Sequence, residues 1–183
     1  VDDSLIHTLD SLQSSGRIAR LSGCQAKLPC HLDGQGNLRL ADKEDGQNNA
    51  FTHILKLPGL QNDPNQLRGA IEWMSMSLAQ AGGVETAGFS LVELPHNVLA
   101  YVTERFDIPT SDKDTRQLYC EDFCSAHSVL PFMKGMSTVE NLIDVIKRCS
   151  TREDDKEQLF RLIYANKLLE NGDFHFKNAA LLS

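Results

Sequence analysis

The sequence predicts an α+β protein with two lobes, a sheet-rich lobe that carries one helix and a mainly helical lobe after it. Strand-like segments joined by turns fill residues 17–106, apart from one amphipathic helical segment. Helical periodicity dominates after residue 115, and a polar stretch with a proline at 107–115 separates the two parts. Strands and helices are therefore segregated along the chain, which favours α+β over an alternating βαβ arrangement.

The first lobe is predicted to begin with a leader and a hairpin. Residues 1–15 are polar with apolar side chains at helical spacing, which indicates a leader or a short helix. A strand is expected over 17–21. Further strands over 27–32 and 37–40 flank the turn Asp33-Gly-Gln-Gly36, and this combination is typical of a hairpin.

The rest of the first lobe combines three strands with the helix. The apolar segment 51–57 predicts a strand, and a Pro-Gly pair ends it. Apolar residues recur at helical spacing over 66–81, so a helix is expected there, ended by a Gly-Gly pair. Strands over 88–94 and 98–106 complete the lobe.

The second lobe is predicted to hold three helices and a loop. Helical patterns occur near 116–127, 138–149 and 153–169, and the last of them ends at Asn171-Gly172. A loop and a short strand finish the chain. The predicted organisation is a leader over 1–15, a sheet-rich first lobe over 16–107 and a partial helical lobe over 108–183.

Composition excludes several classes of protein. The chain has 183 residues, 41% of them hydrophobic and 23% charged, which is ordinary globular usage and excludes wholesale disorder. The net charge of −7 argues against a general nucleic-acid coat or a binder of anionic membranes. No apolar run reaches the roughly 20 residues of a membrane helix. Five cysteines, an odd number, indicate reduced thiols and a cytoplasmic location.

The segment from Asn171 to Asn178, Asn-Gly-Asp-Phe-His-Phe-Lys-Asn, is the sharpest chemical signal. Four residues separate Asp173 from Asn178, which is the spacing of the catalytic loop in protein kinases. Phosphoryl transfer needs a carboxylate at the attacking hydroxyl and an amide oxygen that helps to hold Mg²⁺. The alternative interpretation is a polar helix cap and turn, because Asn-Gly-Asp is common turn chemistry.

Three upstream features raise the weight of the kinase interpretation. Lys56 stands in an otherwise apolar strand, where a kinase places its phosphate-binding lysine, and Glu72 lies on the next helix, where the ion-pair partner of that lysine belongs. Before them, Gly23 makes a turn between two strands that is suited to covering phosphates. The order of glycine turn, strand lysine, helix glutamate and catalytic loop is more specific than any one of these features.

At these positions the chain resembles the HipA-like serine/threonine kinases, toxins of bacterial toxin–antitoxin pairs. The resemblance starts near Gly16, runs to the end and rests on five ordered motifs. The motifs are Ser22-Gly-Cys-Gln-Ala-Lys27 (S-G-x-Q-x-K), Ile54-Leu-Lys-Leu-Pro58 (I-x-K-x-P), Glu104-Arg-Phe-Asp107 (E-R-F-D), Glu121-Asp-Phe-Cys124 (E-D-x-C) and Gly172-Asp-Phe-His-Phe-Lys-Asn178 (G-D-x-H-x-K-N). The resemblance implies a two-lobed protein-kinase-like fold.

The resemblance also implies roles for single residues. Asp173 would be the catalytic base, and Asn178 would bind the metal ion. The residues that would bind ATP are Ser22, Gly23, Cys24, Gln25, Ala26 and Lys27 in the nucleotide loop, Lys56 with Glu72 at the phosphates, Glu104, Arg105 and Phe106 at the adenine, and His175, Phe176, Lys177 and Asn178 in the catalytic loop.

Family members use Mg-ATP to phosphorylate protein hydroxyls, aminoacyl-tRNA synthetases among them. A helix-turn-helix antitoxin holds them inactive, so contact with DNA would be indirect. Several members also phosphorylate a serine in their own nucleotide loop, which makes Ser22 the candidate here. This chain has Arg20 where some members carry a further serine, so self-inhibition would be confined to Ser22.

A second departure concerns the metal site. The family's second metal-binding Asp follows the catalytic loop by a short hairpin, whereas this sequence ends five residues after Asn178. The sequence also begins at Val1 and stops within an apolar run. We therefore expect a piece of a longer protein, whose remaining C-terminal part completes the helical lobe, and we expect the isolated 183 residues not to turn over ATP.

Two other functions remain as alternatives. Small-molecule kinases of the aminoglycoside or choline type share a G-D-x-H-x-x-N loop, although the S-G-x-Q-x-K and E-R-F-D segments favour the protein kinase. The other alternative is a catalytically inactive kinase-like module that only binds a partner.

Overall fold

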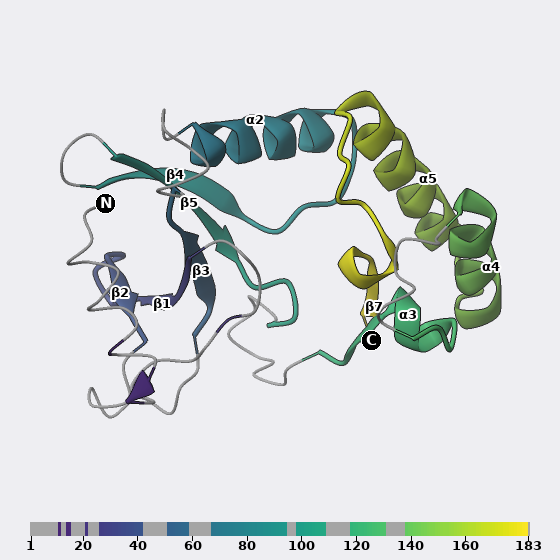
Figure 1. Ribbon diagram of the computed structural model, residues 1–183, viewed down its shortest axis with the longest axis horizontal. Helices are drawn as coiled ribbons and strands as arrows, with labels where there is room; N and C mark the ends of the chain where they lie inside the picture. Colours follow the sequence, from purple (N-terminus) through teal and green to yellow (C-terminus); the bar gives the residue numbers. More distant parts are fainter. Residues whose placement is uncertain are drawn as a thin grey trace. The chain divides into compact units, whose positions relative to one another are not determined.

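A computed structural model gives the fold of most of the chain (Figure 1). It describes residues 11, 14–15, 21, 26–41, 51–58, 67–94, 98–108, 118–130 and 138–182. The predicted leader and the predicted strand over 17–21 lie almost wholly outside these residues. The chain divides into two compact units, the first made of Val1–Met76 with Ala87–Phe106 and the second of Ser77–Thr86 with Asp107–Ser183.

The first unit is built on a five-stranded antiparallel sheet. Its strands are β1 (Lys27–Leu32), β2 (Leu38–Leu40), β3 (His53–Lys56), β4 (Phe89–Leu94) and β5 (Val98–Glu104), in the order β2-β1-β3-β5-β4. All five were expected from the sequence, where alternation and turn residues mark them. The hairpin turn after β1 is held by the Asp33 carboxylate, which accepts hydrogen bonds from the backbone N–H of Gln35 and of Asn37.

The register of this sheet separates its two faces. Because side chains alternate along a strand, residues that are direct partners across neighbouring strands share one face. Lys27, Lys56 and Tyr101 are such partners and share a face across β1, β3 and β5. The next partners along the strands point to the opposite face, where the apolar core gathers. That core contains Leu28, Cys30, Leu55, Leu57, Ala100 and Val102.

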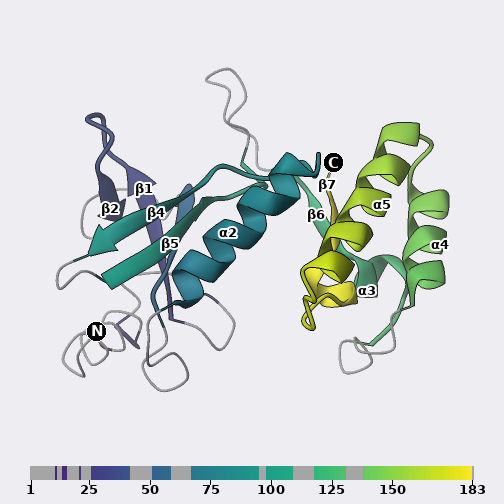
Figure 2. The same ribbon diagram turned by 90° about the horizontal axis from the view of Figure 1, so that it is seen from above.

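Helix α2 (Arg68–Ala81) runs along the sheet (Figure 2). Its close approach depends on Gly69, because a Cβ atom there would lie 2.9 Å from the carbonyl oxygen of Leu99 and 3.3 Å from the backbone nitrogen of Tyr101. One helical turn later, the same approach brings Glu72 to the face of the sheet that carries Lys56.

The second unit is mainly helical. It contains the helices α4 (Val139–Cys149) and α5 (Glu153–Leu168), both close to their predicted bounds, and a two-stranded sheet of β6 (Cys120–Asp122) and β7 (Ala180–Leu182). A short helix α3 (Phe123–Ala126) contacts α4, β6 and the 3-10 turn η4 (Phe176–Asn178), and η4 also contacts β6. The core comprises Phe123, Cys124, Leu142, Val145, Ile146, Leu159, Phe176 and Ala179.

The helix predicted near 116–127 is wrong in part. Residues 120–122 form β6 instead, and only the single turn of α3 follows. Strand β6 exists because it pairs with β7, some sixty residues later in the chain, and local periodicity carries no signal of such a partner. Asp122 ends the strand and starts the helix, since its carboxylate accepts a hydrogen bond of 3.0 Å from the backbone N–H of Ser125.

Helices α2 and α5 end in the same way but with different residues. In each, one residue adopts a left-handed conformation and the next amide N–H bonds back to a carbonyl five residues earlier, which is the Schellman arrangement. The left-handed residue is Gly83 after α2, with φ of 81°, and Glu170 after α5, with φ of 51°. Only the first has the glycine that this conformation favours.

Two general features bear on the class of protein. In the part of the chain that the structure describes, no helix is both long and apolar enough to cross a membrane. The cysteines within it, Cys30, Cys120, Cys124 and Cys149, are free thiols.

Candidate functional site

The first group of predicted site residues lies at the start of β1. Ser22, Gly23, Cys24 and Gln25 fall outside the described residues, so the nucleotide loop itself stays a prediction. Ala26 and Lys27 are described, and Lys27 opens β1 directly opposite Lys56 of β3. The last residue of the predicted loop, Lys27, therefore lies beside the strand lysine.

Lys56 and Glu72 are brought together as the sequence predicted. The Lys56 ammonium donates a hydrogen bond to the Glu72 carboxylate and forms an ion pair with it. The two side chains are 22% and 31% exposed, so solvent reaches the pair only in part. A lysine that extended freely into water would not be held in this way, and the arrangement fixes one cationic group above the sheet.

Tyr101 is a member of this group that the sequence analysis missed. Its ring centroid lies 5.3 Å from the Lys56 ammonium nitrogen, within the range of a cation–π interaction. Burial, helped by the negative charge of Glu72, raises the pKa of the Tyr101 hydroxyl to about 12. The Tyr101 hydroxyl therefore stays protonated and uncharged, and the Lys56 ammonium lies over the face of the ring. The only signal is its pairing with Lys56 across β3 and β5, which no local pattern reveals.

The predicted adenine-binding segment follows β5. The Glu104 carboxylate accepts a hydrogen bond from the Gly88 N–H at 3.3 Å and lies on the face opposite Lys56, because Glu104 pairs with His53. The Arg105 N–H donates to the carbonyl of Thr52 at 2.8 Å. Phe106 is 58% exposed. The structure therefore does not bring the Glu104 side chain to Lys56.

The predicted catalytic loop connects α5 to β7, and its two key side chains, Asp173 and Asn178, meet. The Asn178 amide nitrogen donates to the Asp173 carboxylate at 3.0 Å and to the Asp173 carbonyl at 2.8 Å. The Asp173 side chain is 80% exposed. The loop thus presents one carboxylate to solvent with an amide beside it, as the four-residue spacing predicted.

Phe176 and His175 anchor the middle of the loop. The Phe176 side chain is 2% exposed in the core of the second unit, and its ring meets that of His127 edge to face at 5.4 Å between centroids. The His175 ring is 13% exposed and lies with Nε2 3.4 Å from an Asp173 oxygen, yet neither ring nitrogen makes a hydrogen bond to a described residue. A buried polar atom without a hydrogen bond is costly, and a water molecule or a ligand can supply the missing bond.

Lys177 is held by a residue to which the sequence analysis gave no role. Its ammonium donates to the Asp122 carboxylate at 2.6 Å. This hydrogen bond lowers the pKa of Asp122 and raises the pKa of Lys177. The contact ties the catalytic loop to the junction of β6 and α3, and it gives a structural reason for the Glu121-Asp-Phe-Cys124 motif.

The metal site can be tested only against the residues present. Mg²⁺ binds oxygen ligands and uses one or two carboxylates together with phosphates and water. Asn178 supplies one amide oxygen, which fits part of such a site, and the carboxylate of Asp173, the predicted base, lies beside it. Within the described ranges, no group of three or more His, Cys, Asp or Glu side chains is placed to hold a metal ion.

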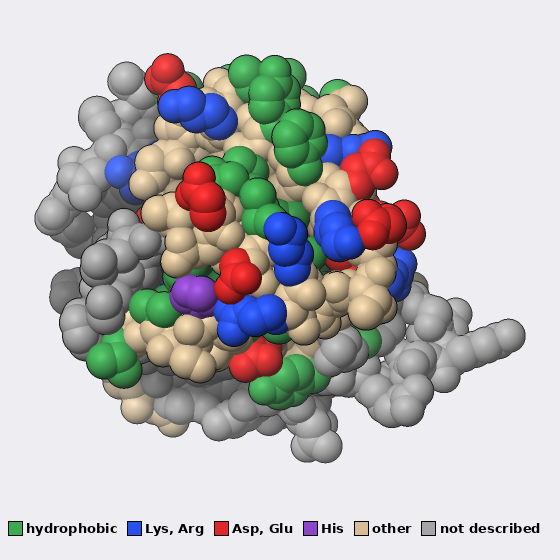
Figure 3. All heavy atoms as spheres, turned by 90° about the vertical axis from the view of Figure 1, so that its right-hand side faces the viewer, with side chains coloured by type: hydrophobic (Ala, Val, Ile, Leu, Met, Phe, Trp, Pro, Cys, Tyr) green, Lys and Arg blue, Asp and Glu red, His purple; other side chains and the backbone are tan. Residues whose placement is uncertain are grey.

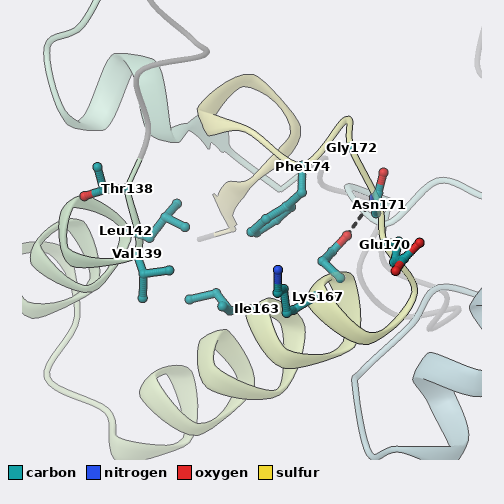
Figure 4. A pocket seen from close by; sticks show the side chains of 10 residues that line it. Thr138, Val139, Leu142, Ile163, Lys167, Glu170, Asn171, Gly172 and Phe174 are labelled. Carbon is teal, nitrogen blue, oxygen red and sulfur yellow. Dashed lines mark hydrogen bonds between the residues drawn. The ribbon is translucent and has the colours of Figure 1, made fainter.

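A pocket of about 530 Å³ lies behind the catalytic loop, within the second unit (Figure 4). The start of α4, the end of α5 and the first residues of the loop form its walls. Its lining comprises Thr138, Val139, Leu142, Ile163, Asn166, Lys167, Glu170, Asn171, Gly172 and Phe174. Figure 4 shows the Asn171 side chain joined by a hydrogen bond to the end of α5.

Helix α5 also carries an exposed apolar row. Phe160, Tyr164 and Leu168 follow one another at four-residue spacing and are 68%, 57% and 65% exposed. Figure 3 views the side on which α4 and α5 lie in Figure 1, where hydrophobic side chains come to the surface among charged side chains of both signs. We call these three residues the α5 row.

Comparison with known proteins places the chain among relatives. The family model described as HipA-like C-terminal domain matches residues 19–183. Among solved structures, the chain is similar to HipA in a complex of the Shewanella oneidensis MR-1 toxin–antitoxin system that contains HipA, HipB and operator DNA, with 21% identity and a TM-score of 0.67. That similarity covers 91% of this chain and 40% of the HipA chain. No curated protein sequence matches this chain.

The structural similarity confirms the fold class expected from the sequence. The fold is a two-lobed, protein-kinase-like α+β fold, with a sheet and one helix in the first lobe and helices in the second. This chain spans less than half the length of the HipA chain that it resembles.

Proposed function

The chain belongs to the family of HipA-like C-terminal domains, and from this premise we propose that it is the nucleotide-binding and catalytic part of a serine/threonine protein kinase. The observation that carries the proposal is the pairing of Asp173 with Asn178 on one loop, 3.0 Å apart. A simple polar turn would not need a largely exposed carboxylate beside an amide at kinase spacing, with a lysine–glutamate pair upstream on strand and helix.

In the proposed reaction, the hydroxyl oxygen of a Ser or Thr side chain attacks the γ-phosphorus of ATP. The bond between that phosphorus and the bridging oxygen breaks, ADP leaves, and the hydroxyl proton passes to the Asp173 carboxylate. The exposure of Asp173 suits this role, because the acceptor arrives from solvent. His175 and Lys177 would complete the environment of the transferred phosphoryl group.

Lys56 would hold the phosphates of ATP. Glu72 and the Tyr101 ring keep its ammonium in one place, so little reorganisation is needed when the phosphates arrive. The loop from Ser22 to Lys27 would cover the phosphates with backbone N–H groups. The segment from Glu104 to Phe106 would contact the adenine.

Asn178 would hold Mg²⁺ through its side-chain amide oxygen. When bound, the ion neutralises charge that develops on the phosphate oxygens. One amide oxygen leaves most of the coordination to water and to ATP. The isolated 183 residues are therefore expected to transfer phosphate poorly without a further carboxylate.

The similarity to a HipA–HipB–DNA complex supports a helix-turn-helix antitoxin as a partner, with DNA contacted only through it. The acceptor would be a protein, with aminoacyl-tRNA synthetases as the class to examine first. Ser22 would be the site of any autophosphorylation. We place this activity in the cytoplasm.

The α5 row would be covered by the remaining C-terminal part of the same protein. The HipA chain that this one resembles is much longer, and an exposed apolar helix face usually marks a contact surface. In the complete natural protein that contains these residues, called the parent chain below, Phe160→Ala should lower the free energy of unfolding by about 3 kcal/mol if Phe160 is covered. A change within about 0.5 kcal/mol would show that it stays exposed.

The decisive experiment uses the parent chain with radiolabelled Mg-ATP and a bacterial lysate, beside its Asp173→Asn variant. We expect labelled protein with the unmodified chain only, because the amide cannot accept the hydroxyl proton. The variant should unfold at the same temperature as the unmodified chain. The labelled band then identifies the acceptor.

Three results would contradict the proposal. Equal labelling by both versions would remove Asp173 from the mechanism. If neither version labels protein and Mg-ATP does not bind, the chain is a kinase-like binding module that has lost the chemistry. Labelling of a small alcohol in place of protein would favour the small-molecule kinase.

A further inference from the structure

The asparagine that precedes the catalytic aspartate is joined to helix α5 by its side chain. The Asn171 amide nitrogen donates to the Asn166 side-chain oxygen at 2.6 Å, and the Asn171 backbone N–H donates to the Asn166 carbonyl at 2.9 Å. Figure 4 shows the side-chain bond beside the pocket. Asn171 is thus bound twice to the last turn of α5.

The other end of the same amide holds Asp173. The Asn171 side-chain oxygen accepts a hydrogen bond of 3.1 Å from the Asp173 backbone N–H. One planar amide therefore spans the gap between the end of a helix and the backbone of the proposed base. Both of its polar atoms are used, so its orientation determines where the Asp173 backbone lies.

Asn166 sets that orientation. Its own amide nitrogen donates to the Leu162 carbonyl at 2.8 Å, one turn earlier in α5, so its oxygen must face Asn171. The Asn171 nitrogen then faces Asn166, and the Asn171 oxygen faces Asp173. Turning either amide over would bring two acceptors or two donors together.

We propose that Asn171 is a positioning residue for Asp173 in phosphoryl transfer, with Asn166 fixing the orientation of its amide. This inference rests on the proposed kinase function. Asp173 is held on its other side by Asn178, which belongs to the proposed metal site. Asn171 connects the backbone of Asp173 to helix α5, and a displaced base loses alignment with the acceptor hydroxyl.

The test compares three variants of the parent chain. Asn171→Ala removes the two side-chain hydrogen bonds, to Asn166 and from Asp173. We expect kcat to fall about 10- to 100-fold while KM for ATP stays unchanged, because the base moves and the nucleotide contacts do not. Asn171→Asp keeps the acceptor for the Asp173 N–H and should retain more activity. Asn141→Ala, a matched control on α4 of the same unit, should leave kcat unchanged.

Hydrogen–deuterium exchange gives a readout that does not depend on activity. Asn171→Ala should speed exchange in the peptide that contains the Asp173 amide, and Asn141→Ala should not. Faster exchange together with the selective fall in kcat supports the proposal.

Three outcomes would overturn it. Faster exchange with kcat unchanged would show that Asn171 only stabilises the turn. A fall in kcat matched by Asn141→Ala would show a general loss of folding. If the unmodified parent chain transfers no phosphate, the proposed function fails and the positioning role fails with it. If the parent chain is active and its Asn171→Ala variant is equally active, only the positioning role is rejected.

Discussion

The proposed phosphate-binding group around Lys56 and the proposed catalytic loop around Asp173 are held in place by different means. Lys56 belongs to a central strand, has partners on both neighbouring strands and is 22% exposed. Asp173 lies in a turn and is 80% exposed, and it donates a hydrogen bond to Asn171 and accepts one from Asn178. Sheet register orients the lysine, whereas side-chain amides orient the aspartate.

This difference shows where each group is sensitive to mutation. A residue oriented by register keeps its position when one neighbour is changed, because the backbone ladder remains. A residue oriented by a few side-chain bonds depends on each of them. The catalytic loop compensates with one deeply buried anchor, Phe176, and with the ion pair of Lys177.

Removal of the buried anchor should have the largest effect on stability. Phe176→Ala should lower the free energy of unfolding by about 3–5 kcal/mol, because a fully buried ring leaves a cavity. Urea unfolding of the parent chain measures it, and Phe176→Leu should cost less than about 1.5 kcal/mol. An unchanged midpoint for the alanine variant would mean that the loop is not anchored by this ring.

Removal of the strand lysine tests the other half of the comparison. Lys56→Ala should lower phosphate transfer by about 10²- to 10³-fold, because one preorganised cation is lost, while the sheet and its melting temperature persist. Labelling assays on the parent chain measure it. Lys156→Ala, which removes an exposed lysine of α5, should leave transfer unchanged. Full activity of the Lys56 variant would make Lys56 an ordinary strand lysine.

The Asp122–Lys177 pair predicts a dependence of stability on pH. The hydrogen bond from Lys177 lowers the pKa of Asp122 below its usual 3.8, so the folded state binds this proton less readily than the unfolded state. The pair therefore stabilises fully above the unfolded pKa, near pH 5 and higher, and loses its effect as pH falls through the lowered value.

Urea unfolding at several pH values tests this expectation. Asp122→Asn should be less stable than the unmodified parent chain at pH 7, and the difference should shrink below about pH 4. Lys177→Met should cause a similar loss, and the double variant should lose less than the sum, because both changes break one contact. A difference that stays constant with pH would assign the effect to the α3 cap instead.

Substitutions at the two helix ends should change the free energy of unfolding least, and the change at Glu170 should be stabilising. Glu170→Gly should raise the free energy of unfolding by about 0.5–1 kcal/mol, since glycine adopts the left-handed conformation without strain. Gly83→Ala, at the matching position after α2, should lower it by about 1 kcal/mol. Thermal unfolding separates the two, and a destabilised Glu170→Gly variant would show that the Glu170 side chain contributes a contact of its own.

Much of the fold followed from local patterns. The strands of the first sheet and helices α2, α4 and α5 were expected near their observed bounds, because alternation, helical spacing and Gly or Pro stops act over a few residues. Strand β6 was missed, because its partner β7 lies at the other end of the second unit's sequence. The end of α5 was predicted only from the Asn171-Gly172 pair, because the left-handed position before this pair is occupied by Glu170 and not by a glycine.

The sequence by itself determined the fold class, the order of the elements and the neighbourhood of Asp173 and Asn178, because these depend on residues a few positions apart. Only the tertiary structure decided that Tyr101 supports Lys56, that Asp122 holds Lys177 and that Glu104 lies on the opposite face of the sheet. These contacts depend on strand register and on the docking of elements far apart in the chain. Register is set by the packing of whole faces, and no short pattern encodes it.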